Sequence, residues 1–443
     1  MEAKESIYNF FYEFEQYDAA ILYNSRTGAL SKLENKFIKQ WKNFLETGVA
    51  QFDEDFLSDL FKCGYLVPKN VDELFLLKTK LMEERYNRRR LYLTIAPTMA
   101  CNFRCVYCFE QGLYGKQCMG EETIENVLKF AETQLEGVDQ LVVSWFGGEP
   151  LLALSVIERI ASKLIEICKE KSIQYSSSIV TNGYLYDYSV ATKLKELKVN
   201  RVQITLDGPE EIHDKRRYLI NGGKTFGVIL DNIVNTCKII PISLRINVDE
   251  DSIDTVNQIM DILRKKGTLK YVTPYLGYVQ SYGGVYAKDK CFSAEEYSKL
   301  NLNFWKVNNV PLQTLYPVPK GNYCLADHCK GWVIDDTGYV YKCWNEIGIK
   351  SRSIGNVNNK ISFIENTKPL QQYLDYDVVG DSECKNCKVL PVCMGGCTYN
   401  RVSGLVRCEQ RRYNLESYIK DYAALLLNYS STSEKNEVCE NSK

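Results

Sequence analysis

The sequence predicts an α/β fold in which a partial (β/α)6 barrel follows a small winged-helix-like module and precedes a cysteine-rich domain. Three observations lead to this expectation. Between residues 91 and 279, six strand-like segments alternate with amphipathic helical segments, which is typical of parallel strands joined by right-handed crossovers. Residues 1–70 instead follow the order strand, strand, helix, helix, strand. From about Gly321 the periodicity gives way to loops rich in cysteine.

Length and composition fit a large globular protein. The chain has 443 residues, of which 45% are hydrophobic and 25% charged, so a sizeable core is expected. A net charge of −1 argues against nucleic acid as a partner, because phosphate binding needs a basic surface. No apolar run reaches the length of a membrane span, and Met1–Tyr17 has no apolar signal region. We expect a cytoplasmic protein without a membrane partner.

The N-terminal module, residues 1–70, is expected to be separate from the barrel. Its expected elements are strands at 20–24 and 28–33, helices at 33–46 and 53–61, and a closing strand at 64–67. Apolar residues recur at helical spacing in the first of these helices. A charged linker helix is expected at 71–90, before the barrel begins.

The barrel is expected at residues 91–310. Its expected strands are 91–96, 141–146, 177–181, 201–206, 242–248 and 271–279, and its expected helices are 121–135, 154–169, 190–197, 226–237 and 253–265. Six units, where a closed TIM barrel has eight, predict a barrel open along one side, with its chemistry at the carboxyl ends of the strands. The cysteine-rich domain is expected at 311–428, with a helix near 413–428, and a disordered tail at 429–443.

Three cysteines lie in the loop directly after the first barrel strand: Cys101, Cys105 and Cys108. Clustered cysteines in a reducing compartment more often bind metal than form disulfides. Three thiolates do not complete the four-ligand set of a structural zinc site, whereas a [4Fe–4S] cluster held by three cysteines keeps one iron free. The spacing therefore favours an iron–sulfur cluster, with zinc as the alternative.

The run Cys101-Asn-Phe-Arg-Cys105-Val-Tyr107-Cys108 resembles the signature of the radical S-adenosylmethionine (radical SAM) superfamily, including the aromatic residue before the last cysteine. The resemblance implies that the free iron binds the amino and carboxylate groups of S-adenosylmethionine. One electron then cleaves the sulfonium, and the resulting 5′-deoxyadenosyl radical takes a hydrogen atom from the substrate. Tyr107 is assigned to the same cofactor site.

Further strand ends resemble the family. Gly147-Gly148-Glu149-Pro150 follows the second strand and resembles the motif that binds the methionyl ammonium; glycines let backbone come close to a ligand, and a carboxylate suits an ammonium. The resemblance also assigns Asn182 to the ribose and Arg245 to the carboxylate of S-adenosylmethionine. A simple turn at 147–150 and structural capping by the other polar residues are the alternatives.

The C-terminal cysteines resemble the SPASM domain, which holds two auxiliary [4Fe–4S] clusters and brings the expected total to three. The resemblance assigns Cys324, Cys329, Cys343 and Cys397 to the first auxiliary cluster and Cys384, Cys387, Cys393 and Cys408 to the second. The spacing from Cys324 to Cys329 is one residue short of the family pattern, so an open iron in the first cluster stays possible. A zinc ribbon at Cys384–Cys397 is the alternative.

Radical enzymes with a SPASM domain act mostly on peptides and proteins. The N-terminal module resembles the recognition element of ribosomal-peptide maturases, which binds a leader peptide as an added strand; a plain N-terminal extension is the alternative. Anaerobic sulfatase-maturating enzymes have an Asp base directly after the cysteine that matches Cys343, and here that position is Trp344, which cannot accept a proton. Glu346 is a conceivable substitute.

We therefore predict a maturase that forms a thioether, or a related cross-link, in a cysteine-containing precursor peptide with a leader. Its electron donor is expected to be a flavodoxin or ferredoxin. Sulfatase-type maturation, carbon–carbon linkage and epimerisation are alternative reactions. A non-enzymatic iron–sulfur scaffold is the alternative from another class, although an electron carrier has no need of the Gly147–Pro150 motif.

Overall fold

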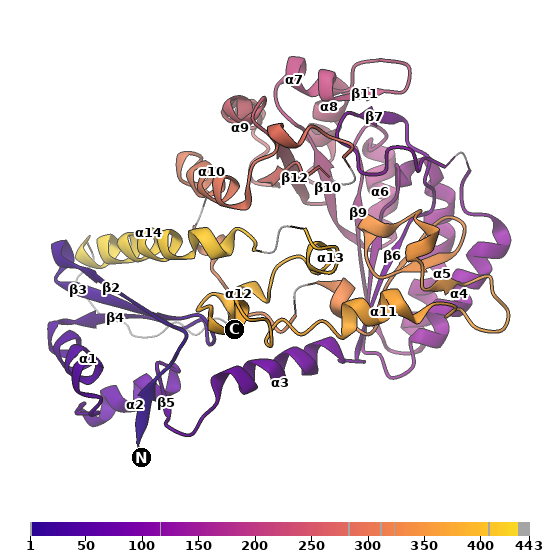
Figure 1. Ribbon diagram of the computed structural model, residues 1–443. Helices are drawn as coiled ribbons and strands as arrows, with labels where there is room; N and C mark the ends of the chain where they lie inside the picture. Colours follow the sequence, from indigo (N-terminus) through magenta and orange to yellow (C-terminus); the bar gives the residue numbers. More distant parts are fainter. Residues whose placement is uncertain are drawn as a thin grey trace. The chain divides into compact units, whose positions relative to one another are not determined.

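The computed structural model describes residues 2–115, 117–281, 284–310, 312–322, 324–405 and 408–432 (Figure 1). The chain forms two compact units. The larger contains Tyr86–Ser293 and Cys324–Tyr376, and the smaller contains Met1–Arg85, Ala294–Tyr323 and Asp377–Lys443. The cysteine-rich segment expected at 311–428 is therefore shared between two units, and each unit joins segments that lie far apart in the sequence.

The larger unit contains the partial barrel, and its six predicted strands are confirmed to within three residues at each end. They are β6 (Arg90–Ile95), β8 (Gln140–Trp145), β9 (Gln174–Val180), β10 (Val199–Thr205), β12 (Ile242–Val248) and β13 (Val272–Tyr278). All neighbouring pairs among these six strands are parallel. Parallel strands in sequential order, each followed by a helix, produce a barrel in which the carboxyl ends meet at one edge.

The crossover helices lie where the apolar periodicity predicted them. They are α4 (Glu121–Gln134), α5 (Leu154–Glu170), α6 (Tyr188–Glu196), α8 (Phe226–Thr236) and α9 (Val256–Lys265). In α5, Ile157, Ile160 and Leu164 recur at helical spacing and are fully buried. A short helix, α7 (Glu210–Arg216), and a two-stranded sheet of β7 (Phe103–Cys105) with β11 (Arg217–Leu219) were not predicted.

The two faces of the barrel strands differ in chemistry. Along β12, Leu244 and Ile246 are fully buried, whereas the alternating Ser243 and Arg245 are only half-buried. Closed barrels fill their interior with branched apolar side chains. The alternation along β12 therefore differs from the all-apolar filling of a closed barrel.

The sheet continues past β6 through a C-terminal hairpin. β14 (Gly331–Ile334) pairs in parallel with β6, and β15 (Tyr339–Tyr341) and β16 (Gly355–Asn356) add antiparallel strands. The sequence did not predict these strands, because their short apolar runs lie among cysteines and turns. The remaining helix here is α11 (Thr367–Leu374). β6 is therefore an interior strand of a nine-stranded sheet.

The smaller unit begins with the antiparallel meander β2 (Asn9–Phe14), β3 (Ala19–Asn24) and β4 (Leu30–Glu34), followed by α1 (Asn35–Thr47) and α2 (Glu54–Lys62). β1 (Ala3–Glu5) pairs with β5 (Leu66–Pro68). Buried Leu22, Trp41 and Phe56 belong to one core that joins the sheet to both helices. β1 and β2 were not predicted, since Asn9–Phe14 reads as a run of aromatics rather than as an alternating strand.

The N-terminal module is not separate, which corrects the expectation. The Tyr23 hydroxyl donates to the Pro317 carbonyl at 3.0 Å, and the Tyr316 hydroxyl donates to the Gly28 carbonyl at 2.7 Å. These contacts bind the module to the C-terminal part of its unit, which contains α10 (Ala294–Val307), α12 (Leu390–Cys393), α13 (Thr398–Val402) and α14 (Arg411–Thr432).

Two other boundaries also differ. The linker helix α3 is Glu73–Arg85, so it ends before the expected Arg90, where β6 already begins. Residues 429–432 belong to α14 rather than to a disordered tail, and 433–443 lie outside the described residues. None of the described helices is long and apolar enough to cross a bilayer.

Candidate active site

The three-cysteine loop follows β6, as predicted, and is ordered by its own backbone. Cys105 is the last residue of β7, and the Cys108 N–H donates to the Cys105 carbonyl at 3.2 Å. The Phe103 N–H donates to Cys101 Sγ at 3.4 Å. Burial raises the pKa of Cys101 to about 12 and that of Cys108 to about 11. Such thiols are protonated at neutral pH, and they release their protons when they coordinate a metal.

The donor set of this loop fits an iron–sulfur cluster better than a single ion. Within the described part of the chain, no group of three His, Cys, Asp or Glu side chains could hold a metal ion. A four-iron cluster places its cysteine ligands on different irons rather than on one ion, so this result concerns mononuclear sites only. The zinc alternatives at Cys101–Cys108 and Cys384–Cys397 gain no support from it.

The Gly147–Glu149 loop lies against the backbone of the cysteine loop. The Gly148 N–H donates to the Thr98 carbonyl at 3.3 Å, and the Glu149 N–H donates to the Ala100 carbonyl at 2.8 Å. A Cβ on Gly147 would collide with the Thr98 carbonyl, and one on Gly148 with the Ala100 carbonyl. Both glycines are thus needed for contact between two loops, a reason that the sequence argument about a ligand did not include.

Glu149 is fully buried and already has three donors from the protein. Oε1 accepts from the Leu151 N–H at 3.0 Å and from Thr181 Oγ1 at 2.7 Å, and Oε2 accepts from the Asn182 N–H at 2.7 Å. Burial raises the pKa of this carboxyl, although the three donors oppose the shift. Glu149 therefore connects the carboxyl ends of β8 and β9, and its contact with a cofactor ammonium stays a prediction.

Asn182 extends this connection to the cysteine loop. Its Nδ2 donates to Asn102 Oδ1 at 2.8 Å, directly beside Cys101. Arg245 lies further along the sheet, where Nε donates to Asn247 Oδ1 at 2.7 Å. A Cβ on Gly277 would lie 2.5 Å from Arg245 Nε, so the glycine makes room for the guanidinium across β13. The ribose and carboxylate assignments of these residues stay predictions.

Tyr107 is held by a buried polar network that the sequence did not predict. Its hydroxyl donates to Asp207 and accepts from Arg217 Nη1 and from Asn247 Nδ2, each at 3.0 Å. Burial raises its pKa well above the usual value. The hydroxyl is thus occupied by protein groups, which leaves the ring as the part of Tyr107 that is able to contact a cofactor.

Two buried arginines follow one another at the end of α7. Arg216 forms ion pairs with Asp207 at 3.2 Å and Asp249 at 2.5 Å, and the Tyr286 hydroxyl donates to Asp249 at 2.6 Å. Asp207 lies two residues after β10, in a strand-end run that resembles the family, and Asp249 comes directly after β12. Position at a strand end is the sequence signal for both carboxylates. Arg217 has no ion pair among the described residues, and its Nε has no hydrogen-bond partner.

The first set of C-terminal cysteines is divided between the units. Cys324, Cys329 and Cys343 belong to the larger unit and Cys397 to the smaller, so their common cluster stays a prediction. Cys324 Sγ accepts from the Ala326 N–H at 3.4 Å. Lys342 is fully buried nearby and donates to the His328 and Gly331 carbonyls at 2.7 and 2.6 Å.

Trp344 and Glu346 have different surroundings. Trp344 stacks on Phe146, with ring centroids 5.2 Å apart, and keeps 41% of its surface exposed. Glu346 is buried and forms an ion pair with Arg352, whose Nη1 also donates to Gln372 at 2.8 Å. Because its carboxylate is bound to a guanidinium, Glu346 is poorly suited to replace a catalytic Asp.

The second set of cysteines lies in the smaller unit, where arginines contact the sulfurs. Arg401 Nη2 donates to Cys384 Sγ at 3.1 Å, and Arg412 Nη1 donates to Cys387 Sγ at 3.2 Å. Cys393 is buried at the end of α12. Cys408 is half-buried and directly follows residues that lie outside the described ranges.

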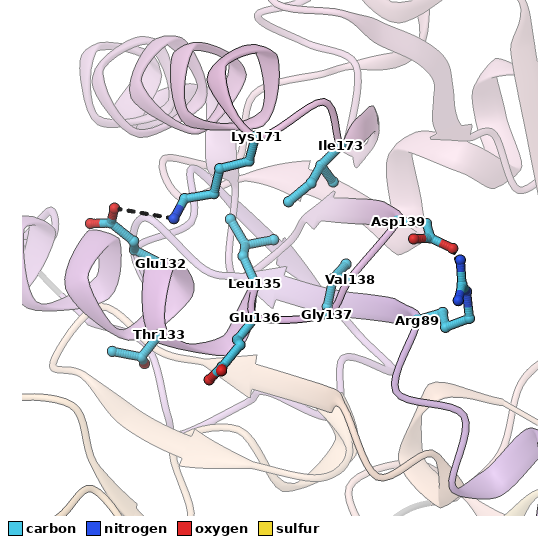
Figure 2. A pocket seen from close by; sticks show the side chains of 10 residues that line it. All are labelled: Arg89, Glu132, Thr133, Leu135, Glu136, Gly137, Val138, Asp139, Lys171 and Ile173. Atoms are coloured by element: carbon cyan, nitrogen blue, oxygen red, sulfur yellow. Dashed lines mark hydrogen bonds and ion pairs between the residues drawn. The ribbon is translucent and has the colours of Figure 1, made fainter.

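A surface hollow of about 740 Å³ in the larger unit is unrelated to these residues (Figure 2). Arg89 and Asp139 form an ion pair at one side of it, and Glu132 faces Lys171 at the other. These residues lie in the last turn of α4, directly after α5, or directly before β6 and β8, so the hollow lies at the amino ends of the strands. It contains none of the predicted site residues.

Known proteins with similar sequences support the assignment of the cysteine loop. Residues 95–266 match the sequence profile described as the Radical SAM superfamily. A cysteine-type anaerobic sulfatase-maturating enzyme of Clostridium perfringens (strain 13 / Type A) is 26% identical over 364 residues, which cover 74% of this chain and 94% of that protein.

Two solved structures share the fold. The anSMEcpe structure with bound AdoMet and a Kp18Cys peptide has a TM-score of 0.60 and 23% identity, covering 77% of this chain and 99% of that chain. SuiB of Streptococcus suis, bound to the precursor peptide SuiA, has a TM-score of 0.53 and 15% identity, covering 90% of this chain and 97% of that chain.

Proposed function

We propose that the chain is a radical SAM enzyme, since residues 95–266 match that superfamily, and that it installs a thioether, or a related cross-link, in a cysteine-containing precursor peptide. The superfamily implies a [4Fe–4S] cluster and S-adenosylmethionine. The match therefore favours an enzyme over a non-enzymatic iron–sulfur scaffold. The observation that supports the site most strongly is the close backbone contact between the cysteine loop and Gly147–Glu149.

In this proposal Cys101, Cys105 and Cys108 hold the cluster. Gly147–Glu149, Asn182, Arg245 and the ring of Tyr107 bind S-adenosylmethionine. Together the bound groups supply a one-electron cleavage of the sulfonium that removes a hydrogen atom from the substrate. A cysteine sulfur would then bond to that carbon: the C–H hydrogen leaves in 5′-deoxyadenosine, the S–H hydrogen leaves as a proton, and one electron passes to an auxiliary iron–sulfur cluster.

Trp344 favours a peptide cross-linking enzyme over a sulfatase-type maturase. An indole cannot remove a proton, and the nearby Glu346 is bound to Arg352. Trp344 instead offers a half-open aromatic surface, stacked on Phe146 directly before Gly147. Sulfatase-type maturation is the second candidate, since a relative of that kind aligns with 74% of the chain.

The N-terminal meander is the proposed binding site for the leader of the peptide. Within the described chain β4 pairs only with β3, so its outer edge is open to an added strand. The outer side of β2 is less open, because Lys388 Nζ donates to the Asn9 carbonyl at 3.0 Å and the Tyr17 hydroxyl donates to Asn428 at 2.7 Å. We assign the leader to the edge of β4.

The two auxiliary clusters complete the proposal. Cys324, Cys329, Cys343 and Cys397 would hold the first, which takes up an electron or a substrate thiolate. Cys384, Cys387, Cys393 and Cys408 would hold the second, which exchanges electrons with a flavodoxin or ferredoxin. We place this reaction in the cytoplasm, where such donors are reduced.

Anaerobic reconstitution with iron and sulfide counting tests the cluster assignments. We expect about twelve irons per chain, falling to about eight in the Cys101/Cys105/Cys108→Ala variant. Cys168→Ala, which replaces a buried cysteine of α5, is the matched control and should keep all twelve. About four irons, with none lost in the triple variant, would refute the cluster assignment.

Mass spectrometry with the precursor peptide tests the reaction. A cross-link removes two hydrogens, and fragmentation separates thioether from carbon–carbon linkage. Mass gain of deuterium in heavy water, without loss of hydrogen in light water, would indicate epimerisation instead. Conversion of a sulfatase Ser or Cys to formylglycine, with no change in the precursor, would support the second candidate.

A further inference from the structure

We infer that Arg217 is a positioning residue whose charge balances the cluster of the three-cysteine loop and raises its reduction potential. The inference rests on the proposed function, because it requires the cluster to be held by Cys101, Cys105 and Cys108. It goes further by assigning an electrostatic role to a residue outside the cysteine motif and outside every S-adenosylmethionine assignment made above.

The β7–β11 pairing fixes Arg217 beside the cysteines. Arg217 is directly opposite Cys105 in this antiparallel pair, so their side chains project from the same face at close range. The loop is bound on both sides of this pair, because the Val106 N–H donates to the Arg216 carbonyl at 3.0 Å and the Ile220 N–H donates to the Asn102 carbonyl at 2.9 Å.

The guanidinium of Arg217 is buried and has no direct ion pair with a carboxylate among the described residues, although the charge of Asp207 acts on it from a longer distance. Only 8% of the residue is exposed, and it forms no ion pair with any described residue. It contacts the Tyr107 hydroxyl, 3.0 Å from Nη1, and the Phe103 ring, whose centroid lies 5.8 Å from Cζ. Nε has no acceptor in the part of the chain that the structure describes.

A buried cation without a directly paired counter-ion is destabilising, and the adjacent Arg216 avoids this cost through direct ion pairs. Arg216 is buried to the same degree but lies between two carboxylates, Asp207 and Asp249. Three cysteine thiolates around a four-iron cluster form an anion. That anion would supply the partner that Arg217 lacks.

The consequence concerns the one-electron reduction of the cluster from [4Fe–4S]2+ to [4Fe–4S]1+, which increases its negative charge. A fixed cation nearby stabilises the reduced state more than the oxidised state, and nearby charge is one of the factors that set cluster potentials. Arg217 would therefore make the electron transfer that precedes sulfonium cleavage easier.

An EPR-monitored redox titration with dithionite, without S-adenosylmethionine, tests the inference on the full chain. The signal that changes when S-adenosylmethionine is added afterwards identifies the cluster in question. In Arg217→Gln we expect the equilibrium constant for reduction to fall at least tenfold, which is about 59 mV for one electron. Arg217→Lys, which keeps the charge, should lie within about threefold of the native protein.

Arg217→Met provides a second neutral variant if Arg217→Gln does not fold, and Arg201→Met, on the exposed side of β10, is the control for loss of a cation elsewhere. Equal shifts in the Lys and Gln variants would show a steric effect and overturn the inference. A neutral Arg217 variant with full iron content and an unchanged reduction potential would also overturn the inference. If that variant also bound S-adenosylmethionine tenfold more weakly, Arg217 would instead be assigned to the carboxylate of the cofactor.

The iron count separates this failure from failure of the proposed function. If native and Cys101/Cys105/Cys108→Ala proteins hold equal iron, the loop holds no cluster and both proposals are wrong. If the triple variant loses its iron but Arg217→Gln leaves the potential unchanged, only the role of Arg217 is wrong.

Discussion

Two cysteine groups of this protein, the three-cysteine loop and the second C-terminal set, are surrounded by charge in different ways. In the larger unit, no described side-chain N–H donates to the sulfurs of Cys101, Cys105 and Cys108, and Arg217 lies opposite Cys105 in the β7–β11 pair. The Tyr114 hydroxyl is a neutral hydrogen-bond partner of the Cys108 sulfur. In the smaller unit, Arg401 and Arg412 donate directly to the sulfurs of Cys384 and Cys387. Hydrogen bonds to sulfur raise cluster potentials, so we expect the second group to hold the more easily reduced cluster.

The largest expected effect separates the two groups by function. Cys101/Cys105/Cys108→Ala should abolish formation of 5′-deoxyadenosine with dithionite, because S-adenosylmethionine then has no iron to bind. Cys384→Ala combined with Cys387→Ala should keep this uncoupled cleavage while losing peptide modification. Chromatographic assay of 5′-deoxyadenosine measures both. If the two variants behave alike, the division of roles between the groups is wrong.

Gly148→Ala tests whether the first group depends on contact between two loops. The added methyl would collide with the Met99 and Ala100 carbonyls, and such overpacking costs about 1–3 kcal/mol in the free energy of unfolding. The amount of iron bound by the three-cysteine loop should also decrease in this variant. Gly227→Ala is the control, because a Cβ there meets nothing within 4 Å and alanine favours the helix by about 0.5–1 kcal/mol. Equal stability of both variants would refute the contact.

The buried network beside the loop should make the larger unit sensitive to acid. Burial, aided by Arg217, lowers the pKa of His213 to about 4, whereas the unfolded chain takes up this proton near pH 6.5. Stability that is fully present above pH 6.5 is therefore lost as the pH falls, by about 2 kcal/mol between pH 7 and pH 5.

His213→Asn keeps an acceptor for the Asp207 N–H, which donates to His213 Nδ1 at 3.2 Å. Denaturant unfolding at the two pH values should show a smaller difference in the variant than in the native protein. An identical pH dependence would mean that other groups cause the acid sensitivity.

The smallest expected effect concerns the arginines of the second group. Arg412→Met should lower the reduction potential of that cluster slightly, because Arg412 is exposed and water screens its charge. Arg401→Met should have a larger effect, since Arg401 is nearly buried. Arg411→Met is the control, because Arg411 donates to the Leu315 carbonyl rather than to a sulfur. An equal shift in Arg411→Met would remove the distinction between the two cysteine groups.

Local periodicity was sufficient to predict the barrel and the loops at its strand ends. Strand β12 and helix α4 begin at the residues expected, because each has a continuous apolar pattern and clear flanking turns. The motif spacing likewise placed Cys101 and Gly147 at neighbouring strand ends. These features depend on short stretches of sequence, so one chain is enough to find them.

What the sequence did not reveal depends on contacts between distant segments. The role of Glu149 as an acceptor for Thr181 and Asn182 requires two strand ends to meet. The sequence shows only two consecutive arginines. It does not show that Arg216 forms ion pairs with two carboxylates while Arg217 forms none with the described residues, because this depends on how α7 and β11 fold. Strand β14 was missed for the same reason, since its four residues become a strand only beside β6.

The pairing of β6 with β14 has a consequence for how the protein is made. Residues 92–95 pair with residues 331–334, so β6 leaves the ribosome about 240 residues before its second neighbour. Until then β6 has an open edge, which is a site for aggregation, and closing so long a loop is slow. The nascent chain thus exposes Cys101, Cys105 and Cys108 long before the sheet around them is complete. Iron that reached these cysteines early would bind to a barrel that is not yet fully folded.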